Sequence, residues 1–220
     1  YKSVYLHFKK VLYGGTMEIG QGFKVSVYVK KNDPVHVYKK YNLKALLYLK
    51  KNQENIQISI EKILCEELKK IKHVKIPKIL ESSEDMLVFE RIYHPDDIDI
   101  NNPSSMLNFK ITNSKDAERK IAGRGNVILF EDLLKEYVGV SKKNKINILK
   151  ALGELGKLLA LLNYKAQLKL KDIEIVIGKD NIKDNDLKLY IIDFDRTEFY
   201  NLKTYLGMLD EFPNYGFDLL

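Results

Sequence analysis

Two aspartates follow directly after an apolar run near the C-terminal end of the chain. Residues 189–192 (LYII) are apolar, and Asp193, Phe194 and Asp195 come next. A buried strand that ends in carboxylates can hold Mg²⁺ at a cleft, because Mg²⁺ prefers oxygen ligands. The same segment is also compatible with a strand that runs into an acidic turn, so its meaning depends on what other elements place beside it.

Strands must position these carboxylates, and the N-terminal part of the chain predicts an antiparallel meander. Residues 24–30 (KVSVYVK) and 35–40 (VHVYKK) alternate between apolar and polar side chains, which is typical of half-buried strands. Gly20 and Gly22 precede the first of these segments and predict a turn there. Lys39 would project from one face of the second strand.

A helix and two more strands are predicted next. Residues 42–51 can form a short helix, and apolar residues at 3.6-residue spacing predict a longer one over 55–72. Glu61 lies at the edge of the apolar stripe of that helix. Residues 78–81 and 86–92 are predicted to form strands that are joined by a polar turn.

The C-terminal half predicts helices and then a hairpin. Residues 94–126 are polar and turn-rich, so we expect a linker or an irregular insertion there. Helices are predicted over 129–137 and 145–166, and the second is apolar on most faces, which indicates a central position. Strands 173–177 and 187–193 are expected to pair as a hairpin that ends in the two aspartates.

The composition fits a globular chain that could contact phosphates. The net charge is +7 and the pI is near 9.1, which suits a nucleotide, a nucleic acid or an acidic protein without choosing among them. The single cysteine, Cys65, excludes internal disulfides and a cysteine-based zinc cluster, and we expect a cytoplasmic protein. No apolar run reaches the ~18 residues needed to span a bilayer, so no membrane partner is expected.

In their order along the chain, these motifs resemble those of the protein-kinase-like superfamily over roughly residues 10–200, outside the insertion. The compact members are the most similar: the lipopolysaccharide (Kdo-type) kinases, the RIO kinases and the small kinase of the KEOPS complex. The motifs that carry the resemblance are Ile19-Gly20-Gln21-Gly22 with Val25 or Val27, Val37-Tyr38-Lys39, Leu87-Val88-Phe89-Glu90-Arg91-Ile92 and Ile192-Asp193-Phe194-Asp195.

The resemblance implies a two-lobed α+β fold with a nucleotide cleft between the lobes. Residues 1–93 would form an N-terminal lobe, an antiparallel sheet with one helix that binds the nucleotide. Residues 94–126 would be a linker or insertion. Residues 127–220 would form a compact, mainly helical C-terminal lobe with a metal-binding hairpin.

The resemblance also implies a site for ATP and Mg²⁺. The backbone at Gly20 and Gly22 would close over the phosphates and offer N–H donors to them. Lys39 would reach the α- and β-phosphates, held in place by Glu61 or Glu66 on the helix. Asp193 would bind the Mg²⁺ that bridges the phosphates. The remaining nucleotide contacts would come from Val27 and Val37 and from the backbone at Glu90 and Ile92.

One part of the kinase pattern is altered in this chain. Kinases place a catalytic Asp about five residues before a metal-binding Asn, and residues 167–174 (QLKLKDIE) hold neither at that spacing. Asp172 would act as the base if the loop is shortened, and Glu174 would substitute as a metal ligand beside Asp193 and Asp195. Such a change need not abolish transfer, since positioning and charge neutralisation carry most of phosphoryl transfer.

The main prediction is an ATP- and Mg²⁺-dependent phosphotransferase that acts on a protein Ser or Thr. A first alternative is a pseudokinase that works as a scaffold or regulator, favoured by the altered loop and by Asp195 in place of a glycine. A second is a metal-dependent nuclease with Asp172 on one strand and Asp186-Leu187-Lys188 on the next, which the basic charge would suit although nucleic acid is not favoured. A third is a structural protein without a site.

Overall fold

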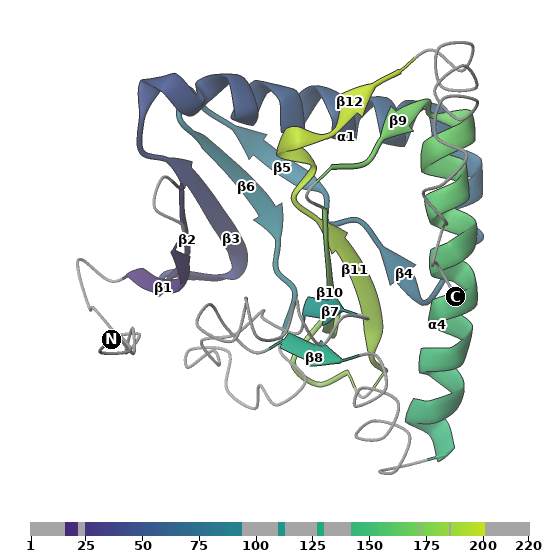
Figure 1. Cartoon of the computed structure of the whole chain (residues 1–220). Coiled ribbons are helices and arrows are strands. Elements are labelled where there is room, and N and C mark those ends of the chain that lie inside the picture. Colours follow the sequence, from purple (N-terminus) through teal and green to yellow (C-terminus); the bar gives the residue numbers. More distant parts are fainter. Residues whose placement is uncertain are drawn as a thin grey trace, which may run out of the picture.

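The structure is a computed structural model that describes residues 16–21, 25–93, 110–112, 127–129, 142–171, 173–184 and 186–200. It shows a mixed α/β fold with an antiparallel sheet and few helices (Figure 1). The strands are β1 (Thr16–Gln21), β2 (Val25–Lys30), β3 (Asp33–Tyr41), β4 (Val74–Lys75), β5 (Ile79–Ser82), β6 (Met86–Glu90), β7 (Lys110–Thr112), β8 (Val127–Leu129), β9 (Leu168–Lys169), β10 (Glu174–Gly178), β11 (Lys188–Ile192) and β12 (Glu198–Phe199). The helices are the short η1 (Lys44–Leu46), α1 (Leu47–Leu68), α4 (Lys142–Ala160), the π-helical η2 (Leu161–Lys165) and η3 (Phe194–Arg196).

The larger sheet has five antiparallel strands in the order β1-β2-β3-β6-β5. The central strand β3 places Lys39 opposite Val27 of β2 on one side and Leu87 of β6 on the other. Helix α1 packs on this sheet through a small apolar cluster, whose members are Tyr41, Leu46, Leu49, Leu87 and Phe89. The strands predicted from the alternating pattern are therefore confirmed, with ends that differ by one or two residues.

A second sheet has three strands in the order β10-β11-β4. The predicted hairpin is confirmed, because β10 and β11 pair antiparallel from Glu174 opposite Ile192 to Gly178 opposite Lys188. Strand β4 adds in parallel on the other side of β11, and the Leu189 backbone N–H donates to the His73 carbonyl at 2.9 Å. A strand of two residues is too short to show an alternation of apolar and polar side chains, so β4 was not predicted from the sequence.

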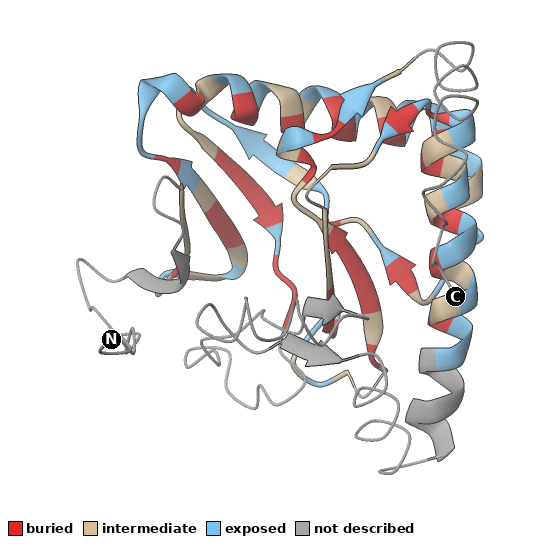
Figure 2. Ribbon diagram, viewed as in Figure 1, coloured by how far each residue is buried: buried red, intermediate tan, exposed pale blue. Residues whose placement is uncertain are grey.

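The main apolar core lies between this hairpin, α1 and α4, as the buried faces in Figure 2 show. Its buried members come from all three elements and include Ile56, Ile60, Leu64, Leu155, Leu158, Leu162, Ile177, Leu189, Ile191 and Phe194. Helix α1 runs from the five-stranded sheet to α4 and contributes to both apolar clusters (Figure 1). It therefore fixes the five-stranded sheet relative to the hairpin.

The predicted helices differ from the observed ones in their bounds. The two predicted helices over 42–51 and 55–72 form one continuous helix, α1, after the short turn η1. In the first half of α1, the polar residues Lys50 and Gln53 are buried. The inner face of this half therefore does not show the apolar spacing from which the longer helix was predicted. The predicted 145–166 helix is α4 followed by the π-helical η2.

The insertion and the shorter predicted helix lie mostly outside the described residues. Strand β7 lies within the predicted insertion and pairs in parallel with β8, which follows the insertion and ends at Leu129. That residue was predicted to begin a helix over 129–137, and it lies in a strand. In the part of the chain that the structure describes, no helix is long and apolar enough to cross a membrane.

Candidate functional site

The Lys39 ammonium lies at the centre of a polar cluster to which both sheets and α1 contribute. Its Nζ is 2.5 Å from Asp193 Oδ1, 3.5 Å from Asp195 Oδ2 and 2.8 Å from Gln53 Oε1. The Lys39 and Asp195 side chains are each only 12% exposed, whereas that of Asp193 is 34% exposed. The sheet and the hairpin thus bring together two charged residues that are 154 positions apart in the sequence.

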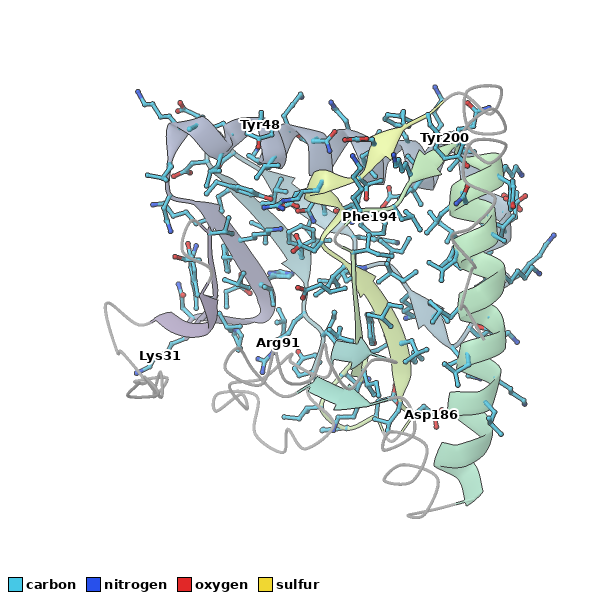
Figure 3. The ribbon with its side chains drawn as sticks, viewed as in Figure 1. Lys31, Tyr48, Arg91, Asp186, Phe194 and Tyr200 are labelled. Carbon is cyan, nitrogen blue, oxygen red and sulfur yellow. The ribbon has the colours of Figure 1, made fainter. Side chains whose placement is uncertain are left out.

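The turn after β11 aims the Asp193 carboxylate at Lys39. Asp193 adopts the left-handed backbone conformation, with φ 67° and ψ 58°, which Asp and Asn accept more readily than most residues do. Phe194 is fully buried in the main core beneath α1 (Figure 3). Asn52 of α1 donates to the carbonyls of Asp195 and Thr197 at 2.9 and 2.8 Å. The turn is therefore held from both sides.

The electrostatics of the cluster favour a charged lysine. Burial disfavours the Lys39 charge, but the Asp193, Tyr41 and Asp195 oxygens outweigh it and raise the pKa of Lys39 above its ordinary 10.5. Burial raises the pKa of Asp195, and Lys39 offsets only part of that effect. Burial also raises the pKa of Tyr41 to about 12, and the neutral Tyr41 hydroxyl donates to Gln53 Oε1 at 3.0 Å.

This cluster borders a cleft whose walls are mostly apolar. The cleft is lined by Val27, Val37, Lys39, Gln53, Gln57, Pro77, Phe89, Glu90, Ile92, Glu174, Ile191, Ile192, Asp193 and Phe194. Lys39 is the one cationic side chain among these described lining residues. An apolar slot with a few polar groups at one end suits a flat, largely apolar ring that carries an anionic tail.

Most of the residues predicted from the sequence meet in this cleft. Its lining includes Val27, Val37, Lys39, Glu90, Ile92, Glu174 and Asp193, and Asp195 contacts Lys39. Gly20 lies in β1 opposite Val27, directly after an irregularity in the pairing of β1 with β2. Gly22 and Asp172 lie outside the described residues, so their predicted roles in phosphate binding and catalysis stay predictions.

The structure does not bring the predicted helix carboxylates to Lys39. Glu61 is exposed and lines a separate groove between α1 and β5, whereas Glu66 is exposed and pairs with Lys69. The α1 side chain that contacts Lys39 is Gln53. Glu61 lies eight residues further along the helix, about 12 Å at 1.5 Å per residue, which is beyond reach.

Gln53 is the site residue that sequence reasoning missed. A helix carboxylate is the more obvious partner for a lysine, and Gln53 precedes the apolar stripe that defined the predicted helix. Its spacing offered a signal, because Gln53, Gln57 and Ile60 recur at intervals of three or four residues and are all buried. Polar residues on the buried face of a helix indicate a polar partner across the interface.

The carboxylates of the cleft suit Mg²⁺ shared with a ligand rather than a cage built by protein alone. Among the described residues, no group of three or more His, Cys, Asp or Glu side chains is arranged to hold a metal ion. Mg²⁺ is commonly bound through one or two carboxylates together with substrate phosphates and water. Asp193 and Glu174, which line the same cleft from the ends of paired strands, provide such a set.

The hairpin register gives the nuclease alternative no support. That alternative requires Lys188 near Asp172, which precedes β10 and is itself outside the described residues. Lys188 pairs with Gly178 at the far end of the hairpin from Glu174, a separation of about 13 Å along the strand. The Lys188 ammonium instead bonds to Asp180, which also accepts from Tyr190 at 2.8 Å.

No family model matches the chain, and the comparison with curated proteins found no match. Among solved structures, phosphoribosylaminoimidazole-succinocarboxamide synthase from Ehrlichia chaffeensis is similar at 12% identity and a TM-score of 0.40, over 88% of this chain and 94% of that one. The GDP complex of wild-type aminoglycoside 2'-phosphotransferase-IIIa is similar at 14% identity and a TM-score of 0.30, over 94% of this chain and 76% of that one. The GDP and kanamycin complex of APH(2")-IIia has the same identity and coverage and a TM-score of 0.27.

Proposed function

We propose that the cleft binds ATP with Mg²⁺ and that the protein is a phosphotransferase of the protein-kinase-like type. The observation that carries the proposal is the 2.5 Å contact between Lys39 on the central strand and Asp193 at the end of the hairpin. In protein kinases, a strand lysine and a carboxylate that holds Mg²⁺ bind the phosphates of the nucleotide, and Lys39 and Asp193 would do so here. The acceptor that we propose is a Ser or Thr hydroxyl of a protein.

Each part of the ligand would have a matching part of the cleft. The apolar walls from β2, β3, β6 and β11 would enclose the adenine, with backbone groups at Glu90 and Ile92 along its edge. Lys39 would bind phosphate oxygens, and Asp193 and Glu174 would hold Mg²⁺, which would supply charge neutralisation on the phosphates. We also propose two lobes on either side of this cleft, residues 1–93 and 127–220, with 94–126 as an insertion.

Thermal unfolding with and without ATP and Mg²⁺ tests the binding step. A ligand at 100 times its Kd stabilises a folded protein by about 2.7 kcal/mol. For a chain of this size we expect the midpoint to rise by about 5–10 °C. Asp193→Ala and Lys39→Met should abolish the rise, because each removes a group that would contact the phosphates or the metal.

Lys40→Met is the matched control for Lys39→Met. Lys40 is the next residue on β3, is exposed, and pairs with the equally exposed Asp85 at 3.5 Å. It should keep the full stabilisation by ATP. Absence of any ATP effect on the unaltered protein, or equal losses in the two lysine variants, would contradict the proposed site.

A second candidate function is nucleotide binding without phosphate transfer, as in a pseudokinase. It is favoured by residues 167–174, which lack the Asp and Asn spacing of a kinase catalytic loop. Transfer of labelled γ-phosphate to the protein itself or to an added protein separates the two. Transfer that is lost in Asp193→Ala supports the phosphotransferase, whereas ATP binding without transfer supports the pseudokinase.

A further inference from the structure

Two buried glutamines of α1 connect Lys39 to the backbone of Pro77, which lines the same cleft. The Gln53 and Gln57 side chains are 3% and 4% exposed, and both line the cleft. Gln53 Oε1 accepts from Lys39 Nζ at 2.8 Å and from the Tyr41 hydroxyl at 3.0 Å. Gln53 Nε2 donates to Gln57 Oε1 at 3.3 Å, and Gln57 Nε2 donates to the Pro77 carbonyl at 2.8 Å.

The two ends of this series of hydrogen bonds, at Lys39 and at Pro77, fix the orientation of both glutamine side-chain amides. The Pro77 carbonyl can only accept, so Gln57 must turn its NH₂ group toward it and its oxygen toward Gln53. Gln53 must then offer its own NH₂ group to Gln57 and its oxygen to Lys39. At the other end the Lys39 ammonium can only donate, which requires the same orientation. Gln53 Oε1 is therefore the acceptor for Lys39, and the Gln53 amide cannot flip without losing hydrogen bonds.

The charge of the partner matters as much as its position. Lys39 already faces two carboxylates, Asp193 and Asp195, and a glutamate at position 53 would add a third around a single ammonium. A neutral amide holds the Lys39 ammonium in place by a hydrogen bond but does not neutralise its positive charge. More of that charge then remains for an anionic ligand, because interactions between charges in a partly buried site are weakly screened.

We propose that Gln53 is a positioning residue that holds Lys39 for phosphate binding without neutralising it, and that Gln57 fixes the orientation of the Gln53 amide. This inference rests on the proposed nucleotide function and adds a feature of α1 to it. It predicts that Gln53 strengthens binding of the nucleotide phosphates through Lys39, without itself needing to contact the ligand.

Binding of Mg²⁺·ATP and of adenosine to position-53 and position-57 variants tests the inference. Gln53→Glu should weaken the binding of Mg²⁺·ATP at least tenfold. It should leave adenosine binding unchanged, because adenosine carries no phosphate. Gln53→Leu and Gln57→Leu should also weaken the binding of Mg²⁺·ATP but not that of adenosine. The effect of Gln57→Leu should be the smaller one, because Gln53 keeps its contact with Lys39. Glu61→Gln, on the same helix but exposed and away from Lys39, is the control and should bind both ligands as the unaltered protein does.

A second readout needs no nucleotide. Acylation of the Lys39 amine by an amine-reactive reagent at one fixed pH, quantified by mass spectrometry against Lys40, should be several-fold faster in Gln53→Leu, because the Lys39 side chain loses one of the hydrogen bonds that hold it away from the reagent. Unchanged Lys39 labelling in that variant would overturn the positioning role even in a protein that binds no ATP. ATP binding by the unaltered protein together with full affinity in Gln53→Glu would overturn the inference and leave the proposed function standing. Equal losses of ATP and adenosine would show a purely structural role and would also overturn it.

Discussion

Asp193 combines an uncommon backbone conformation with a direct contact to Lys39 at the cleft. A non-glycine residue in the left-handed region costs of order 1–3 kcal/mol when its surroundings impose it. The surroundings sustain this cost, because Phe194 is buried in the core and Asn52 donates to the carbonyls of Asp195 and Thr197. The strained residue is the one whose carboxylate reaches Lys39, which agrees with the tendency of such conformations to occur at functional sites.

Away from the cleft, Glu154 links α4 to the segment before β4 and should make stability depend on pH. Its carboxylate accepts from the backbone N–H groups of Lys72 and His73 at 2.8 and 2.6 Å and from His73 Nδ1 at 3.0 Å. Burial raises the pKa of Glu154, but these donors outweigh it and hold the pKa below its ordinary 4.5. The stabilisation is therefore complete above about pH 4.5 and is lost as the pH falls through the lower, folded-state value.

Glu154→Gln should lower the free energy of unfolding by about 2 kcal/mol at pH 7, because a charged acceptor of several hydrogen bonds becomes an amide. Urea unfolding at pH 7 and at pH 3 measures this difference, which should shrink at the lower pH. Glu66→Gln is the control, since that carboxylate and its partner Lys69 are both exposed. A difference that is the same at both pH values would contradict the role given to the ionised Glu154.

At the residue scale, the sequence indicated Lys39 and Asp193 but gave no indication of Gln53. Lys39 and Asp193 could be predicted because the order of the motifs along the chain resembles that of the protein-kinase-like superfamily, which places a lysine on one strand and a metal-binding aspartate after a later one. Gln53 could not, since a glutamine in a helix is usually solvated and carries no charge that demands a partner. The choice of Glu61 assumed that a lysine is held by a carboxylate, and in this chain Asp193 and Asp195 already meet that need.

At the element scale, the two sheets approach one another at Gly178, the last residue of β10. Tyr93, just after β6, exchanges backbone hydrogen bonds of 3.0 and 2.9 Å with Lys179. A Cβ atom on Gly178 would lie 2.8 Å from the Tyr93 carbonyl oxygen and would overlap the Ile92 side chain, which lines the cleft. Only glycine allows this approach.

Gly178→Ala should therefore lower the free energy of unfolding by about 1–3 kcal/mol, because backbone and side chain must move apart. Gly153→Ala is the matched control, since Gly153 is exposed in α4 and an added Cβ meets nothing within 4 Å. That change should stabilise the protein by roughly 0.5–1 kcal/mol through helix propensity. Chemical denaturation of both variants measures the two effects. Equal effects in the two variants would contradict the close approach at Gly178.

Element existence was easier to predict than element extent. Strands β2 and β3 follow the alternating pattern, and β6 and β11 follow short apolar runs. The start of α1 follows no apolar pattern, because Lys50 and Gln53 are buried on its inner face. The pairing of β4 with β11 depends on where α1 ends and on the contact between His73 and Glu154. Such tertiary contacts leave no local pattern in the sequence.

At the scale of the whole molecule, the cleft is a product of two sheets whose residues are distant in sequence. One wall comes from β2, β3 and β6, and the other comes from β10, β11 and the turn after it. The order of the motifs could be read from the sequence, but their meeting in space was an expectation drawn from the resemblance. Helix α1 secures it physically, since its buried residues contact both the sheet and the main core.

A ligand that occupies the whole cleft must therefore stabilise both sheets together. At 100 times its Kd, Mg²⁺·ATP should slow by about 100-fold the exchange of amides in β3, β6 and β11 that exchange through unfolding of their own sheet, which corresponds to the 2.7 kcal/mol of linked stability. Hydrogen exchange followed by mass spectrometry measures each strand separately. Asp193→Ala should show no such slowing at the same ATP concentration, because the phosphates and the metal would lose their ligand. Slowing confined to β3 and β6, with β11 unchanged, would mean that the nucleotide binds the five-stranded sheet alone and that Lys39 and Asp193 do not act on the same ligand.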